Sequence, residues 1–102
     1  MDLILVYVTH SDQNNANKVS DHLFQQKLIA SVNSWSTMTT YMRKGSMKRG
    51  EEIITLYKTK PQNWLLVKEA IKFIHPDDTP CIIKLTGTVN HGHGNWVTDS
   101  VI

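Results

Sequence analysis

A long segment in the middle of the chain, residues 30–43, constrains the fold more than any other part of the sequence. It reads ASVNSWSTMTTYMR, contains neither glycine nor proline, and is rich in residues typical of β-strands. Residues 43–50, RKGSMKRG, predict a turn, and residues 53–59, IITLYKT, predict the returning strand. This hairpin is longer than the other strands of the chain, so part of its backbone would be left without a partner.

Two further strands are predicted outside the hairpin. The continuous apolar run from Leu3 to Val8 indicates a central strand that is covered on both faces. Residues 81–86, CIIKLT, indicate a fourth strand. The tail, residues 87–102, holds the segment VNHGHGNW, and we expect either a short helix or a strand at its end.

Two amphipathic helices separate these strands. Apolar residues recur at helical spacing over residues 13–28, where Ser11 or Asp12 can cap the helix. A second apolar stripe runs over residues 64–74. His75 ends that helix, because the residue before a proline disfavours the helical region of backbone space.

The predicted order of elements is β-α-β-β-α-β, which is typical of an α+β ferredoxin-like fold. Residues 1–102 are expected to form one domain, a four-stranded antiparallel sheet with both helices on one face and a C-terminal tail. The other face of the sheet and the overhanging hairpin then lack a cover. Burial against further copies of the chain would solve both problems, so the sequence predicts an oligomer.

Composition argues against several classes of protein. The chain is 40% hydrophobic and 20% charged, as is ordinary for a soluble globular protein. A net charge of +2 does not demand a nucleic-acid partner, and LILVYV and CIIKLT lack the aromatic residues of an RNA-binding sheet. LILVYV is also too short to cross a membrane. Cys81 is the only cysteine, so no intrachain disulfide is expected and a cytoplasmic location is favoured.

An enzymatic function is not expected. Acylphosphatases share this strand order but need an arginine in the loop after the first strand. That loop reads THSDQNN here, with neither arginine nor glycine. We therefore predict no catalytic residues and no required cofactor.

A set of landmarks is spread over nearly the whole chain at characteristic spacing. These are Ala30-Ser31-Val32-Asn33, Tyr41, Gly45, Glu52, Lys58-Thr59, His75-Pro76-Asp77-Asp78-Thr79-Pro80 and Trp96. With this set the chain resembles the CutA divalent-cation-tolerance family. The resemblance implies a ferredoxin-like trimer with clefts between its subunits and a link to divalent metals, copper especially. Ser31 stands where family members often carry a cysteine, and Val8 stands where some of them do, so two candidate thiolate ligands are missing.

Histidines are the candidate metal ligands. In an extended segment residues two apart point to the same side, so His91 and His93 together could hold Cu²⁺ or another divalent cation. Two ligands do not make a tight site, and a third is needed from His75, Asp77 or a neighbouring subunit. The alternative is that the glycine-rich segment is an exposed loop that binds nothing.

Five residues are expected to line the clefts that the resemblance implies, namely Tyr41, Glu52, Lys58, Asp77 and Trp96. Glu52 and Lys58 are an even number of positions apart on one predicted strand, which places them on one face of the sheet. They either hold a small ligand or form an interfacial salt bridge that fixes the register of the subunits.

The function expected from these features is a homotrimer in metal homeostasis that binds copper, another divalent cation or a small ligand between its subunits. The alternative is a signalling trimer similar to the PII proteins, which senses a nucleotide or another small anion. The cations of the turn are compatible with this alternative, although no glycine-rich phosphate cradle is present. These cations are Arg43, Lys44, Lys48 and Arg49.

Overall fold

The computed structural model describes all 102 residues of the chain. Its elements are β1 (Asp2–His10), α1 (Gln13–Gln25), β2 (Ser31–Arg43), β3 (Ser46–Thr59), the 3₁₀ helix η1 (Pro61–Asn63), α2 (Trp64–Ile74), β4 (Ile82–Thr88) and α3 (His91–Ser100). The predicted α+β order is confirmed, and α3 adds a third helix after β4. None of the helices combines the length and the apolar character that a membrane span requires.

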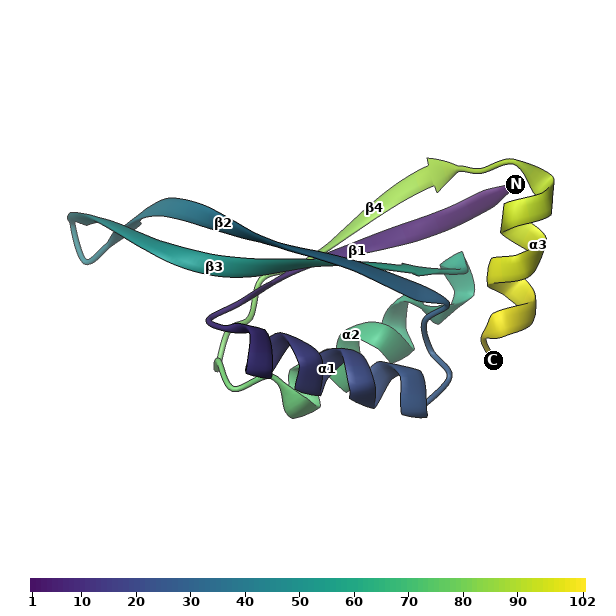
Figure 1. Cartoon of the computed structure of the whole chain (residues 1–102), viewed down its shortest axis with the longest axis horizontal. Coiled ribbons are helices and arrows are strands. Elements are labelled where there is room, and N and C mark those ends of the chain that lie inside the picture. Colours follow the sequence, from purple (N-terminus) through teal and green to yellow (C-terminus); the bar gives the residue numbers. More distant parts are fainter.

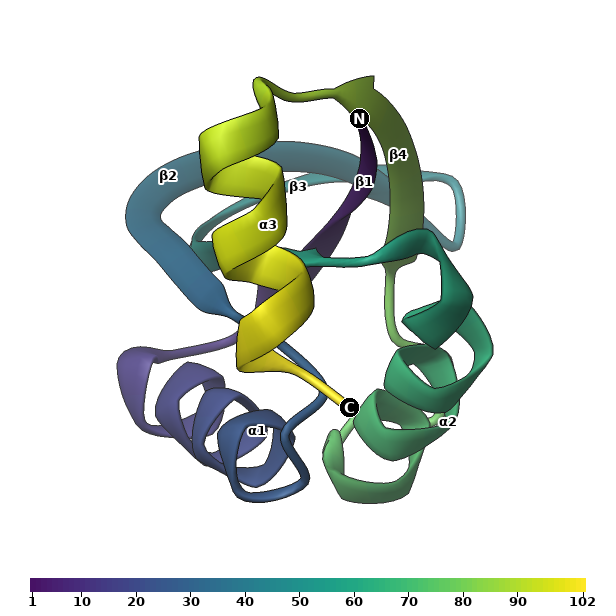
Figure 2. The same cartoon turned by 90° about the vertical axis from the view of Figure 1, so that its right-hand side faces the viewer.

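One antiparallel sheet, with strand order β2-β3-β1-β4, forms the centre of the molecule. Helices α1 and α2 lie side by side against one face of this sheet, below it in Figure 1. Helix α3 crosses the end of the sheet at which the N-terminus lies, as Figure 2 shows. The face opposite α1 and α2, here called the open face, is therefore left without a helical layer.

Helix α1 is shorter than its apolar pattern predicts. Asp12 caps it by accepting a hydrogen bond from the backbone N–H of Asn15 at 2.8 Å, as expected. The helix ends at Gln25 instead of residue 28, because Lys27 adopts a left-handed conformation with φ of 56°. The backbone N–H of Leu28 then bonds back to Leu23, which turns the chain toward β2.

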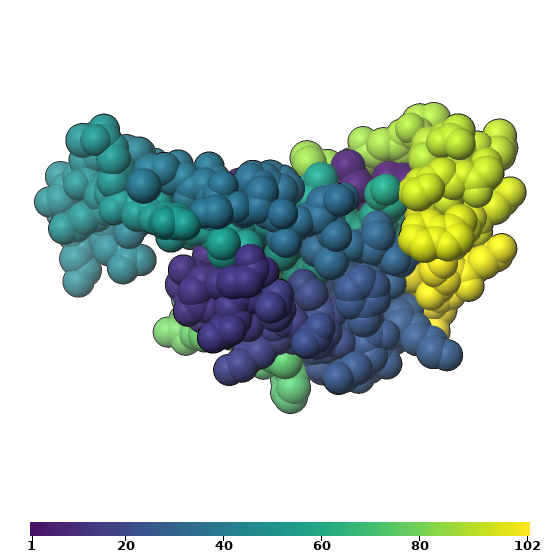
Figure 3. All heavy atoms as spheres, viewed as in Figure 1, coloured from purple at the N-terminus to yellow at the C-terminus, as the bar shows by residue number.

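The β2–β3 hairpin is longer than predicted. Residues 43–50 were expected to form the turn, but only Lys44 and Gly45 do so, with φ of 49° and 78°. Such a two-residue turn suits the right-handed twist of the strands, so β3 starts at Ser46 and runs for 14 residues. The hairpin projects beyond the helices at the left of Figures 1 and 3, and the molecule is 46 Å long.

The hydrophobic core lies between the sheet and helices α1 and α2. Its side chains come from alternate positions of β1, from Tyr57 of β3 and from the inner faces of both helices. Tyr57 is fully buried, and its hydroxyl group lies 3.0 Å from the Ser20 hydroxyl of α1. A buried polar group is thus satisfied inside the core.

The open face carries large apolar side chains that the chain itself does not cover. Trp35, Ile83 and Leu85 are 45 to 46% exposed. The strand register places Leu5, Tyr7 and Leu56 on the same face, opposite the core-facing residues. The expectation that this face lacks a cover within one copy is confirmed.

Helix α3 corrects the expectation of an extended glycine–histidine segment. His91 and His93 lie in its first turn, where residues two apart point to different sides, so they do not form the same-side pair expected of an extended chain. The segment has poor intrinsic helix propensity because it contains Gly92 and Gly94. Packing decides its structure instead, since Gly94 and Val97 are buried, and Gly94 lies against Met1.

Candidate functional site

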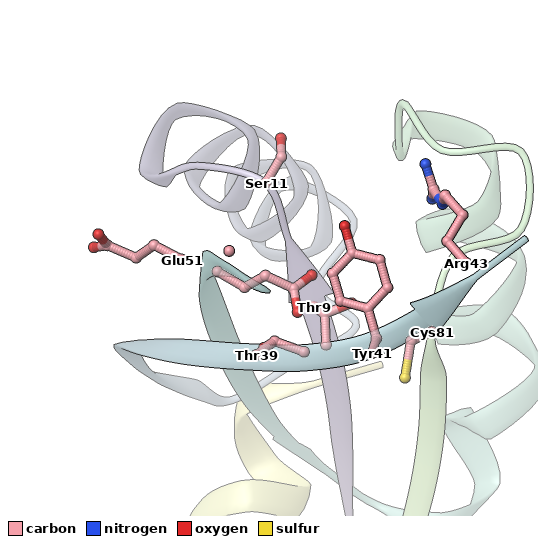
Figure 4. A pocket seen from close by; sticks show the side chains of 9 residues that line it. Thr9, Ser11, Thr39, Tyr41, Arg43, Glu51 and Cys81 are labelled. Carbon is pink, nitrogen blue, oxygen red and sulfur yellow. The ribbon is translucent and has the colours of Figure 1, made fainter. Parts of the chain in front are cut away.

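A hollow of about 450 Å³ opens on the open face at the base of the projecting hairpin. Its lining comes from β1, β2 and β3, from Ser11 just after β1 and from Cys81 just before β4, as can be followed in Figure 4. The lining residues are Thr9, Ser11, Thr39, Tyr41, Arg43, Gly50, Glu51, Glu52 and Cys81. The structure thus brings together Tyr41 and Glu52, two of the residues expected in a cleft, and adds Cys81 to them.

The chemistry of this hollow combines a carboxylate, a thiol and a phenol. Partial burial, and then the negative charge of Glu52, raise the pKa of the Cys81 thiol. The thiol therefore stays protonated near neutral pH and is a poor nucleophile there. A soft metal ion could still bind it by displacing the proton, with Glu52 as a neighbouring oxygen ligand.

A second group lies at the other end of the sheet, where α3 meets β3. The Lys58 ammonium nitrogen is 3.0 Å from Nε2 of His93. The His93 ring lies 5.3 Å from the ring of Trp96, which is 48% exposed. Lys58 and Trp96 were both expected to line a cleft, and His93 was expected to bind a metal, so the structure joins residues from two separate predictions.

A third group surrounds His75 at the C-terminal end of α2. Nε2 of His75 lies 2.9 Å from the carbonyl oxygen of Thr9, and Nδ1 accepts a hydrogen bond from the backbone N–H of Asp77 at 3.1 Å. The Asp77 carboxylate is 4.0 Å from Nδ1. Both ring nitrogens thus have partners inside the chain, and His75 fastens the end of α2 to β1.

His10 belongs to this third group and was not singled out from the sequence. Its ring stacks on His75 at 5.3 Å, and its side chain is almost completely buried. The only available signal was its position, since His10 continues the core-facing alternation of Ile4, Val6 and Val8 along β1. That alternation predicts burial, but it does not predict a second histidine from α2 beside it.

The three histidines proposed as metal ligands do not meet within one copy. His75 lies beside His10, whereas His93 contacts Lys58, which pairs with Leu5. Five strand positions separate these two points, or about 17 Å. No group of three or more His, Cys, Asp and Glu side chains in the chain is arranged to hold a metal ion.

Glu52 and Lys58 lie on one face of an unbroken β3, as their spacing predicts. They are six positions apart, or roughly 20 Å, and do not contact each other. Glu52 belongs to the hollow at the hairpin base, and Lys58 belongs to the group near α3. Glu52 and Lys58 thus lie at opposite ends of one face, and Asp77, also expected in a cleft, lies apart from both, beside His75.

Comparisons with known proteins give one consistent result. A family model described as CutA1 divalent ion tolerance protein matches residues 4–100. The divalent-cation tolerance protein CutA of Thermococcus kodakarensis is 33% identical over 98 residues, covering 95% of this chain and 94% of that protein. The crystal structure of CutA1 from Pyrococcus horikoshii is 31% identical, covers 97% of this chain and 98% of that chain, and has a TM-score of 0.93.

A more distant structure shares the fold. The periplasmic divalent cation tolerance protein CutA from Archaeoglobus fulgidus is 22% identical, covers 98% of this chain and 99% of that chain, and has a TM-score of 0.94. The arrangement of strands and helices is therefore kept at low sequence identity.

Proposed function

The chain belongs to the CutA1 divalent ion tolerance family, and from this premise we propose that it works as a homotrimer that holds a divalent cation or a small ligand between its subunits. Copper is the favoured cation, because imidazole and sulfur ligands bind it more tightly than other divalent first-row metals. The cellular role is metal homeostasis, and the protein catalyses no reaction in this proposal.

The main support for this proposal is the sheet face that the chain leaves uncovered. Trp35, Ile83 and Leu85 are nearly half exposed on it, which is costly for a protein that stays a single copy in water. The hairpin that projects from the sheet also exposes Met38, Met42 and Met47 by 63 to 68%. Association of three copies through the open face would bury Trp35, Ile83 and Leu85 and place the hollow at the hairpin base beside another subunit. The strand register places the methionines on the opposite face of the hairpin, where a neighbouring copy could cover them separately.

The distribution of ligands supports a site between subunits rather than inside one. His91 is exposed, and Glu52 and Cys81 line an open hollow, so each is available to complete a site that a second copy begins. His75 is less available because both of its ring nitrogens have partners. A copper ion bound by two or three copies would therefore also hold the trimer together.

Two measurements test this function. Light scattering gives the mass of the protein in dilute solution, and a mass three times that of the chain is expected. Calorimetric titration with Cu²⁺ should then show saturable binding with a dissociation constant below about 1 mM. A monomer would contradict the proposed trimer. A trimer that shows no saturable copper binding would contradict the proposed metal binding.

The competing function is that of a trimer that senses a nucleotide or another small anion. A hollow of about 400 Å³ at the hairpin tip favours it, because Arg43, Lys44, Ser46 and Lys48 line this hollow and supply three cations. None of these cations has a carboxylate within salt-bridge distance, since the only such contact in the chain involves His75. A rise in the melting temperature with one or more nucleotides of a tested panel, but not with copper, would favour this function.

We also propose that the protein works in the cytoplasm. Cys81 is a free thiol on the surface, and free thiols persist best in a reducing compartment. The Archaeoglobus fulgidus structure is described as periplasmic, so the compartment needs its own test. Cell fractionation followed by immunodetection of the native protein distinguishes the two locations.

A further inference from the structure

Lys58 and His93 form a pair that presents only hydrogen-bond donors to its surroundings. The two nitrogen atoms are 3.0 Å apart. A lysine ammonium can donate but cannot accept, so Nε2 of His93 must be the acceptor and the proton of the neutral ring lies on Nδ1. The remaining ammonium hydrogens and the Nδ1–H group are then available to a ligand.

The positive charge of Lys58 has no negative partner in the chain. Its nitrogen has no hydrogen bond other than the one to His93, and no carboxylate lies within 4.0 Å of it. Lys58 is also partly buried between neighbouring strands, on the same face as Leu5 and Ser31. Because a partly desolvated cation is costly when it is unpaired, this position favours an anion.

Trp96 supplies an apolar surface directly beside these donors. Its ring lies 5.3 Å from the His93 ring, at an angle of 33°, and about half of the side chain is exposed. A ligand that combines a negative group with a flat apolar part could place the negative group on Lys58 and stack its apolar part on Trp96. A hydrated inorganic anion could use only the first of these contacts.

We propose that Lys58, His93 and Trp96 form a site for a carboxylate, a step that builds on the proposed function by naming a ligand class for one end of the cleft. The same geometry disfavours a divalent cation there, because Lys58 occupies the Nε2 lone pair and adds a positive charge at 3.0 Å. The carboxylate belongs either to a small planar acid or to a side chain of a second copy, and the test distinguishes these two sources.

The first arm of the test uses benzoate as the probe and benzamide as its neutral counterpart. The indole N–H resonance of Trp96, assigned with Trp96→Phe, reports on binding in ¹H–¹⁵N spectra. A saturable shift with benzoate, and none with benzamide, is expected for a small-molecule site. Lys58→Gln should weaken benzoate binding about ten-fold, whereas the matched control Lys60→Gln, which removes a lysine outside the group, should leave it within about two-fold.

The second arm measures the mass of the same two variants by light scattering. If a side chain of a second copy supplies the carboxylate, the assembled protein does not bind benzoate, and Lys58→Gln lowers the oligomeric mass while Lys60→Gln does not. Either result supports a carboxylate on Lys58. The inference is overturned if benzoate up to about 10 mM leaves the Trp96 resonance unchanged and Lys58→Gln also keeps the wild-type mass.

The failure of this inference and the failure of the proposed function have different signatures. Copper titration and the mass of the wild-type protein judge the proposed function. The dependence of benzoate binding or assembly on Lys58 judges the carboxylate site. A copper-binding trimer in which neither benzoate binding nor assembly depends on Lys58 would support the proposed function and reject the carboxylate site.

Discussion

His10 and His75 stack on each other inside the fold, with ring centroids 5.3 Å apart and ring planes inclined by 24°. His10 is 1% exposed, and its Nε2 atom lies 2.8 Å from the Thr55 hydroxyl. Its Nδ1 atom is buried without a hydrogen-bond partner. Burial, and then the nearby charge of His75, lower the pKa of His10 to about 4, against a smaller opposite effect of Asp77.

The stability of the fold should therefore depend on pH through His10. Its pKa is about 4 in the folded chain and 6.5 for an ordinary histidine, so the unfolded chain binds the proton more tightly. The contribution of His10 to the free energy of unfolding is fully present above pH 6.5. It falls by up to roughly 3 kcal/mol as the pH falls toward 4. Urea unfolding between pH 4 and 7 measures this slope.

Two variants isolate the His10 contribution to that slope. His10→Gln keeps an amide group that can donate to Thr55 but does not titrate, so the slope should become shallower. His91→Gln removes an exposed histidine and should leave the slope of the wild type. Equal slopes for wild type and His10→Gln would show that His10 does not control the acid response.

A charge on the open face should dissociate the oligomer. Leu85→Lys places an ammonium group among Ile83, Tyr7 and Leu5 on the face proposed to be buried, where an unpaired charge is strongly disfavoured. Phe73→Lys is the matched control, since Phe73 is an 83% exposed apolar residue on α2. Light scattering should give a monomer mass for Leu85→Lys and an unchanged mass for Phe73→Lys. An oligomer that survives Leu85→Lys would place the interface elsewhere.

The two glycines of α3 should respond differently to alanine. A Cβ atom at Gly92 would meet only the Asn90 side-chain nitrogen, at an ordinary contact distance of 4.0 Å, so Gly92→Ala should stabilise the fold by about 0.5–1 kcal/mol through better helix propensity. A Cβ atom at Gly94 would overlap the Met1 sulfur and approach Val89 Cγ1 to 3.0 Å. Gly94→Ala should therefore destabilise it by about 1–2 kcal/mol. Urea unfolding at neutral pH compares the two, and equal effects would contradict the packing of α3 against the N-terminus.

Copper binding should be only modestly reduced when His91 and His93 are both replaced by glutamine. The two rings point to different sides of α3, and Lys58 occupies Nε2 of His93, so the pair is poorly arranged for one ion. We expect a loss of less than about ten-fold in affinity by calorimetry. A loss of a hundred-fold or more would show that the segment rearranges to bind copper.

Local patterns in the sequence were sufficient to predict most of the fold. The alternation along β1, the cap at Asp12 and the helix end at His75 all depend on residues within a few positions of one another, so they can be read without knowing the rest of the molecule. The boundaries were less accurate where a single residue adopts a left-handed conformation, as Lys27 does after α1.

The sequence by itself determined the order of the four strands and the first two α-helices, and it showed that one sheet face would lack a cover, because periodicity and turn chemistry are local properties. Only the tertiary structure decided that the glycine-rich tail is a helix, that His93 meets Lys58 and that His10 meets His75. Those relationships join residues 35 and more positions apart. They depend on strand register and on which surfaces pack together, and no local pattern encodes either.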